Sequence, residues 1–162
     1  LETETSLFVE QYLRKLGLEN IRRGFDGTQS GVMADLKGGK PGRCVALRAD
    51  IDALPLEEEN DVPYKSTHSG VMHACGHDGH TTIALAVAEV LSEHRAQLNG
   101  RVKFVFQPAE EIALGASAMI EDGVLLNPAP DVALGLHLWN ELPLGTVGIT
   151  DGAVMAGASD FR

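Results

Sequence analysis

The chain of 162 residues is long enough for one domain with a substantial core, and its composition is globular, with 44% hydrophobic and 22% charged residues. Its net charge of −10 argues against nucleic acid as the main partner, because phosphate binding needs clustered Lys and Arg. No apolar run reaches the roughly 20 residues of a membrane span, nothing resembles a signal peptide, and the presence of only two cysteines predicts a reducing cytoplasm.

The amino-terminal part predicts one helix and then short strands. Apolar residues over 7–16 recur at helical spacing, and Gly17 is a typical helix stop. Residues 20–23 and 31–36 are interpreted as strands, and the Gly- and Lys-rich segment 37–42 as the turn between hairpin arms.

A buried strand and a long helix follow. Residues 43–49 are nearly continuously apolar, which is typical of a strand covered on both faces, and they end at Asp50. Apolar positions over 81–98 recur at helical spacing, with Asp78 as the predicted N-cap and Asn99-Gly100 as the end of the helix.

Strands and helices continue to alternate towards the carboxyl end. We expect strands over 101–106 and 132–137, with a helix over 115–122 between them. This alternation predicts an α/β fold with a largely parallel or mixed sheet flanked by helices, in which ligands bind beyond the carboxyl ends of the strands. The donor side chains that fall at such places are Asp50, Cys75, Glu110, Glu111 and His137.

The segment 72–80 gathers three imidazoles, one thiol and one carboxylate ahead of the long helix. Cys75 and His77 are two residues apart, so on an extended loop both side chains point to the same side and can reach one or two metal ions. A buried thiol and a capping histidine are the alternative. His73 and His80 either orient a ligand or are plain surface or cap residues.

Glu110 and Glu111 are the most diagnostic pair. On an extended backbone adjacent side chains point to opposite sides, so one carboxylate can hold a metal while the other faces a water and moves its proton. The alternative is a pair of exposed glutamates.

His137 ends a run that we interpret as a buried strand. A lone histidine there is more often a core residue than a ligand, but the neighbouring donors favour a ligand. No role is expected for His68 or His94, and Trp139 is either a pocket wall or a core anchor.

These motifs resemble the M20 family of metallopeptidases, in particular its amidohydrolase branch, which includes hippurate hydrolases, N-acyl-amino-acid amidohydrolases and auxin-conjugate hydrolases. They run in the family's order over nearly the whole chain. The matching segments are 47–55 (LRADIDALP), 72–78 (MHACGHD), 107–111 (QPAEE) and 135–137 (GLH).

The resemblance implies a site that holds two divalent metal ions, of Mn, Zn, Ni or Co. It implies Glu110 as the catalytic base and acid, and Asp50 as a catalytic carboxylate that orients a ligand. Other branches of the family have a metal-binding histidine where this chain has Arg48, so His77 is expected to supply that imidazole. The implied metal ligands are Cys75, which bridges as a thiolate, His77, Glu111 and His137.

The family's catalytic domain is interrupted by a lid and dimerisation domain, and residues 156–161 resemble the approach to that junction. We therefore expect residues 1–162 to be the amino-terminal part of the metal-binding catalytic domain, truncated before the lid. The lid histidine and a final ligand histidine would then be missing. The fragment alone is predicted to bind metal weakly and to hydrolyse nothing, whereas the full-length protein is predicted to be a homodimer.

The predicted function is metal-dependent cleavage of the amide bond of a small N-acyl amino acid, without nucleic acid or membrane partners. Three alternatives remain. The first is a di- or carboxypeptidase of the same superfamily that acts on short peptides. The second is a non-catalytic metal-binding module, in which Glu110 would have no purpose. The third is a redox enzyme built on Cys75, which is disfavoured because no resolving cysteine lies near it in the sequence.

Overall fold

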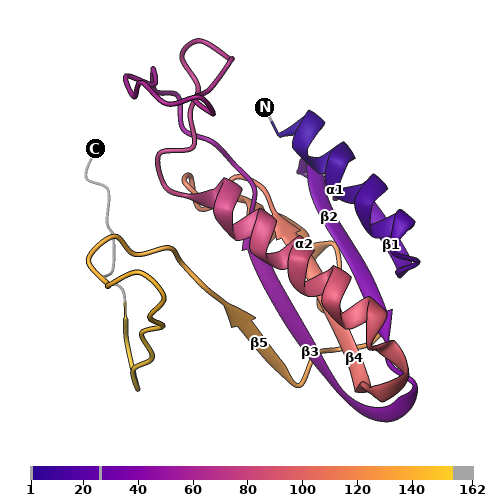
Figure 1. Cartoon of the computed structure of the whole chain (residues 1–162). Coiled ribbons are helices and arrows are strands. Elements are labelled where there is room, and N and C mark those ends of the chain that lie inside the picture. Colours follow the sequence, from indigo (N-terminus) through magenta and orange to yellow (C-terminus); the bar gives the residue numbers. More distant parts are fainter. Residues whose placement is uncertain (1, 26, 155–162) are drawn as a thin grey trace.

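A mixed sheet of five strands forms the centre of the molecule (Figure 1). The computed structural model describes residues 2–25 and 27–154, so the expected lid junction at 156–161 lies outside the described residues. The strands lie side by side in the order β1-β2-β4-β3-β5. Their bounds are β1 (Glu19–Phe25), β2 (Thr28–Lys37), β3 (Lys40–Asp50), β4 (Asn99–Gln107) and β5 (Val132–Gly135).

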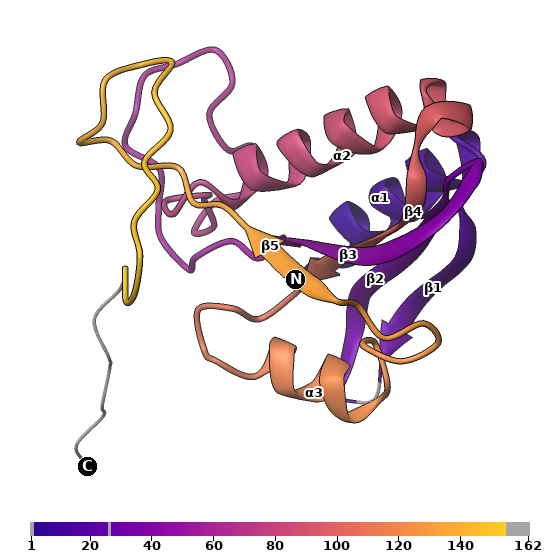
Figure 2. The same cartoon turned by 90° about the horizontal axis from the view of Figure 1, so that it is seen from below.

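Helices cover both faces of this sheet, as the α/β prediction requires. Helices α1 (Thr3–Lys15) and α2 (His77–Glu93) lie on one face, and the short α3 (Gly115–Glu121) lies on the other (Figure 2). A 3₁₀ turn, Arg95–Gln97, joins α2 to β4. Within the described ranges, no helix is both long enough and apolar enough to cross a membrane.

Strand β4 supplies the core because its side chains alternate between two covered faces. Phe104 and Phe106 are fully buried beneath α1 and α2, whereas Val105 packs on the other face against Met119 of α3. Lys103 is fully buried and donates from Nζ to the carbonyls of Val124 and Leu126, at 3.1 and 2.8 Å. The burial of an entire charged side chain is therefore compensated by hydrogen bonds.

The prediction of a hairpin turn over 37–42 is wrong. Strand β4 lies between β2 and β3, antiparallel to the first and parallel to the second, and the antiparallel hairpin of the amino-terminal part is β1–β2. Gly38 and Gly39 serve a close approach of backbones instead. A Cβ atom on Gly38 would lie 2.3 Å from the Leu98 carbonyl oxygen, and one on Gly39 would lie 2.6 Å from the Ala96 oxygen.

Three parallel strands end at the same edge of the sheet. β3 pairs in parallel with β4 on one side and with β5 on the other. The strand expected over 132–137 is shorter than predicted, since its pairing stops at Gly135, and its residues are exposed. It is an edge strand in the described chain, which is why its apolar residues do not lie in the core that the sequence suggested.

Candidate metal centre

Strand β3 and the residues just after it bring two buried carboxylates, Asp50 and Asp52, to the shared edge. Asp50 accepts hydrogen bonds from His80 Nδ1 at 2.6 Å and from Arg48 Nη1 at 2.8 Å. Burial raises the pKa of Asp50, but the His80 hydrogen bond and the Arg48 charge oppose it and leave the pKa below its ordinary value. Asp50 is therefore an ionised carboxylate that its neighbours hold in place.

Arg48 belongs to this arrangement as a cation and not as a ligand. Its Nε donates to Gln107 Oε1 at 2.9 Å, while Nη1 donates to Asp50. Gln107 ends β4 beside Asp50 in the parallel register. A guanidinium carries no free lone pair for a metal, so Arg48 is not a ligand. Its bonds to Asp50 and Gln107 hold the ends of β3 and β4 together, and its charge compensates one negative charge.

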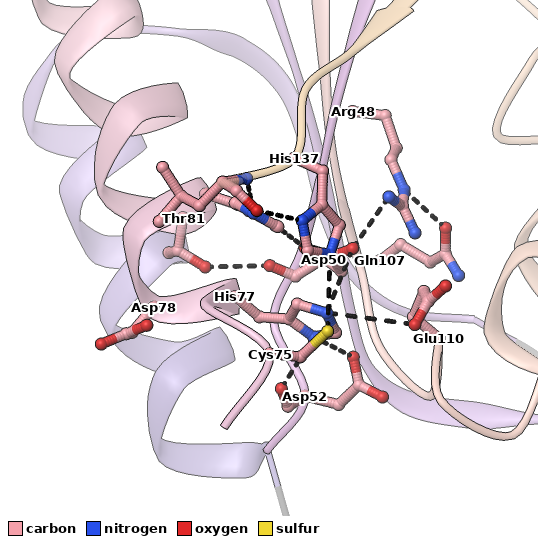
Figure 3. Close-up of polar contacts among 12 residues, drawn as sticks. Arg48, Asp50, Asp52, Cys75, His77, Asp78, Thr81, Gln107, Glu110 and His137 are labelled. Atoms are coloured by element: carbon pink, nitrogen blue, oxygen red, sulfur yellow. Dashed lines mark hydrogen bonds and ion pairs between the residues drawn. The ribbon is translucent and has the colours of Figure 1, made fainter. Parts of the chain in front are cut away.

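Helix α2 begins at the same edge. Its N-cap is Gly76, with φ of +86°, so the prediction of Asp78 as the N-cap is wrong. Asp78 lies in the first turn, exposed, and points away from the cluster (Figure 3). Glycine is needed at position 76 because a left-handed backbone turns the Cys75 loop directly into the helix.

His77 presents one nitrogen to the cluster in a defined state. Its Nδ1–H donates to Asp52, whose carbonyl oxygen lies at 2.9 Å and whose carboxylate Oδ1 lies at 3.1 Å (Figure 3). In the neutral ring the proton is therefore on Nδ1, and Nε2 carries a lone pair. That Nε2 is buried and has no hydrogen-bond partner.

Carboxylate oxygens surround the same nitrogen. Asp50 Oδ2 lies 3.5 Å from His77 Nε2, and oxygens of Glu110 and Glu111 lie at 3.9 and 3.8 Å. A lone pair that faces three carboxylates is repulsive unless a cation or a proton lies between them. The donor set therefore fits a divalent ion, and the hydrogen bond to Asp52 is the support that metal-binding histidines usually have.

The backbone of Glu110 and Glu111 differs from the prediction. Both lie in a turn after β4, not on an extended segment, and both carboxylates face His77 instead of pointing to opposite sides. Ala109 has φ of +51°, and a Cβ on Gly115 would lie 1.6 Å from the Pro108 carbonyl oxygen. A tight turn closed at Gly115 thus brings two acids to one place, helped by a 3.0 Å bond from Glu111 N–H to Asp52.

His137 reaches the cluster from the end of β5. Its Nδ1–H donates to the Leu138 carbonyl oxygen at 2.6 Å, so Nε2 carries the lone pair, and Nε2 lies 3.4 Å from Cys75 Sγ. Burial, a hydrogen bond to Glu111 and the nearby acids raise the pKa of Cys75 to about 11. A thiolate at this place therefore needs a cation beside it.

The structure brings every predicted site residue into one cluster. Groups of donor atoms that lie within 4.8 Å of one another link Cys75 with His77 and His137, and His77 with Glu110 and Glu111. His80 was left without a defined role by the sequence, yet it is buried and bonded to Asp50. Its spacing of three residues from His77 on one helix is the signal that could have found it.

A hollow lies away from this cluster, at the other end of the parallel strands. It has a volume of about 650 Å³ and is lined at the amino ends of the parallel strands by residues that include Cys44, Arg101 and Asp131. Binding sites of parallel α/β sheets lie beyond the opposite, carboxyl ends. The donors that could hold a metal ion therefore lie at the fold's expected binding edge, at the Cys75 cluster.

An α/β sheet with sulfur, imidazole and carboxylate donors at its carboxyl edge defines the class of a metal-binding domain. Residues 46–155 match the model of peptidase family M20/M25/M40, and the chain belongs to that family. The expected family is thereby confirmed.

Curated relatives and solved structures agree with this membership. The chain is 44% identical to an N-acyl-L-amino acid amidohydrolase of Geobacillus stearothermophilus and 42% identical to thermostable carboxypeptidase 2 of Saccharolobus solfataricus. In both cases the match covers 99% of the chain and, respectively, 42% and 40% of the relative. The crystal structure of Bacillus subtilis YxeP, described as a dinuclear metal-binding peptidase of the M20 family, superposes with a TM-score of 0.86 at 42% identity, over 94% of this chain and 42% of that one. The chain spans about two fifths of the length of the curated relatives it matches.

Proposed function

We propose that this edge of the sheet holds two divalent metal ions for the hydrolysis of amide bonds. Cys75, as a thiolate, would hold them together with His77, Glu111 and His137. The observation that carries the proposal is His77 Nε2, which is buried, unpartnered and directed at carboxylates. The description of YxeP as dinuclear supports the number of ions.

Bound ions would polarise the scissile carbonyl and lower the pKa of the attacking water. Glu110 then takes a proton from that water at a carboxylate oxygen and delivers it to the leaving nitrogen. Its side chain is 39% exposed, so it can reach a substrate, and one of its oxygens lies 3.9 Å from His77 Nε2. The products are a carboxylic acid and a free amine, and the water supplies the oxygen and hydrogen that balance them.

Asp50 and Asp52 act through other residues in this proposal. Asp52 fixes the tautomer of His77 and accepts the Glu111 N–H, so one carboxylate orients two of the proposed ligands. Asp50, ionised and bonded to His80 and Arg48, contributes negative charge 3.5 Å from His77 Nε2. Removal of either should change the geometry of the centre before it changes the chemistry.

The proposed substrate is an N-acyl amino acid, which the name of the Geobacillus relative supports. Short peptides are the second candidate, favoured by the carboxypeptidase of Saccharolobus at nearly the same identity. Three further statements stay predictions. They are that this chain is the amino-terminal part of a catalytic domain interrupted by a lid, that the full-length protein is a dimer, and that it is cytoplasmic. Mn, Zn, Ni and Co all suit donors of this mixed type.

The deciding experiment uses the complete gene product, stripped of metal and then reloaded separately with Mn, Co and Zn. N-acetyl, N-benzoyl and indoleacetyl amino acids are assayed beside dipeptides, and release of free amino acid is measured. We expect no hydrolysis without metal, recovery with at least one metal, and preference for acyl amino acids over dipeptides.

Each other outcome has a definite meaning. Preference for dipeptides would replace the substrate class and keep the metal centre. Stoichiometric metal uptake without hydrolysis of any substrate would favour a non-catalytic metal-binding module and contradict the proposed role of Glu110.

A further inference from the structure

His80 connects two segments that approach the cluster from different strands. The ring is buried, with 1% of the residue exposed, and its Nδ1 lies 2.6 Å from Asp50 at the end of β3. Its Nε2 lies 2.9 Å from the backbone nitrogen of Leu138, beyond the end of β5. The side chain thus joins β3 to the segment that carries His137.

The two partners determine the tautomer of His80. A backbone N–H can only donate, so Leu138 N–H donates and Nε2 accepts. The ring proton is then on Nδ1 and is donated to the Asp50 carboxylate. Although Asp50, His77 and His80 lie close enough together to hold an ion, both nitrogens of His80 are already engaged. This separates His80 from His77 and His137, whose Nε2 lone pairs face the cluster.

The bond to Leu138 acts where the sheet no longer holds the chain. The pairing of β5 with β3 stops at Gly135, opposite Arg48, two residues before His137. His137 is exposed, and its ring lies edge-on to that of His80 at 4.6 Å. Anchoring of the next residue, Leu138, therefore limits where the His137 imidazole can lie.

A steric contact in the same helical turn supports this anchor. The Leu138 side chain packs over the bare backbone of Gly76 and Gly79 at the start of α2. A Cβ on Gly79 would lie 2.5 Å from Leu138 Cδ1, a distance at which the leucine must move. Two consecutive residues, Gly79 and His80, thus make a steric and a polar contact with the residue next to His137.

We propose that His80 is a positioning residue that, with Gly79, seats Leu138 and so holds His137 against Cys75. The inference rests on the proposed metal centre and assigns a function to a histidine that ligates no ion. It predicts that the Leu138 bond, more than the Asp50 bond, controls how well the ion beside His137 is held.

Two substitutions of His80 separate its bonds. In His80→Asn the side-chain amide lies near the original Nδ1 position and can still donate to Asp50, but it cannot reach Leu138. In His80→Gln the amide oxygen lies near the original Nε2 position and can still accept from Leu138 N–H. The complete, metal-stripped enzyme is titrated with Co²⁺ against a competing chelator, and kcat and KM are measured with an N-acyl amino acid.

We expect His80→Asn and His80→Ala to weaken binding of one of two Co²⁺ ions by about 10–100-fold, the usual effect of losing a residue that supports a ligand. They should lower kcat with little change in KM, whereas His80→Gln should stay within a few-fold of wild type. Equal effects of Asn and Gln, or unchanged Co²⁺ affinity in all three variants with only a lower unfolding midpoint, would show a plain core histidine and overturn the inference. Wild-type enzyme that binds no Co²⁺ would instead overturn the metal centre itself.

A steric test leaves every polar group in place and therefore does not depend on how well the His80 variants fold. Gly79→Ala should weaken Co²⁺ binding, because the new methyl group displaces Leu138. The double variant Gly79→Ala/Leu138→Ala removes the obstructed side chain, keeps the backbone N–H and should recover most of the affinity. Wild-type affinity in Gly79→Ala alone, or no recovery in the double variant, would contradict the proposed seat.

Discussion

Acids of this chain gather in two regions that differ in burial and in their partners. On the β1–β2 side, Asp35 is fully buried and accepts from Asn20 at 2.9 Å and from Arg101 at 3.0 Å. At the carboxyl edge, Glu110 and Glu111 face an imidazole nitrogen that carries a lone pair. Asp35 is paired with a protein cation, although its second oxygen, Oδ1, is buried without a hydrogen-bond partner, whereas the carboxyl edge has more electron-pair donors than protein cations.

This difference separates a structural ion pair from a site. Each region has an arginine, but Arg48 is already shared between Asp50 and Gln107. Its single charge cannot also compensate the two glutamates. The donors at the carboxyl edge therefore suit a cation from outside the chain, whereas Asp35 already has Arg101 as its cation.

The largest expected effect breaks the chemistry of the second region and keeps its donors. Glu110→Gln should reduce turnover by about 10²–10⁴-fold, because an amide cannot take a proton from water. Metal binding should be almost unchanged, since Glu110 is not among the proposed ligands. The matched control is Glu111→Gln, which should lose metal affinity first. Near-normal rates in Glu110→Gln, measured by release of amino acid, would remove its assigned role.

Substitutions around Asp35 should change the stability of the protein but not its metal affinity. Arg101→Ala leaves Asp35 buried with only Asn20 as a partner and should cost about 3 kcal/mol of unfolding free energy, measured by urea denaturation. Metal affinity should be unchanged, because Arg101 lies at the start of β4 and the site lies beyond its end. Replacing both Asp35 and Arg101 with apolar residues should cost less than the single change. A loss of metal affinity in Arg101→Ala would show that the two regions are coupled.

Within the site, a substitution of Asp52 tests whether its hydrogen bonds to the proposed ligands strengthen metal binding. Asp52→Ala removes the side-chain acceptor of the His77 Nδ1–H and of the Glu111 N–H, so metal affinity should fall by about 10–100-fold. Asp131→Ala is the control, because it also removes a carboxylate that accepts a backbone N–H, that of Cys44, but at the far end of β3. Equal metal affinities in the two variants would leave Asp52 without its orienting role.

Local patterns were enough to predict the residues that meet at the site. Cys75 and His77 stand two apart before a helix, and Glu110 follows a strand of alternating phenylalanines. Because parallel strands end at one edge, a sequence that predicts the strands also predicts that their following residues converge. The fold class and the gathering of Asp50 and His137 with these residues needed nothing further.

Apart from the helix N-cap, which lies at Gly76 and not at Asp78, the errors concern how segments pack against one another. The glycines at 38 and 39 look like a hairpin turn, because nothing local reveals that β4 enters between β2 and β3. The burial of His80 depends on Leu138, which is 58 residues away. The turn at Glu110 depends on the approach of Gly115 to Pro108. Each of these is decided by packing, which periodicity does not encode.

The smallest expected effect concerns Glu10, an arginine-paired acid near the surface. The hydrogen bond from Arg14 lowers the pKa of Glu10, burial opposes this, and Arg23 lowers the pKa again, so it lies below the ordinary 4.5. A carboxyl whose pKa is lowered on folding stabilises the protein above its unfolded value and loses that contribution as the pH falls below 4.5 through the folded pKa. In metal-stripped protein, Glu10→Gln should therefore cost less than about 1 kcal/mol near neutral pH and nothing once the carboxyl is protonated. Urea midpoints measured near neutral pH and at a pH where the carboxyl is protonated test this, with Glu4→Gln in the same helix as the control. A cost that persists in acid would mean that Glu10 acts by packing and that its ion pairs contribute little.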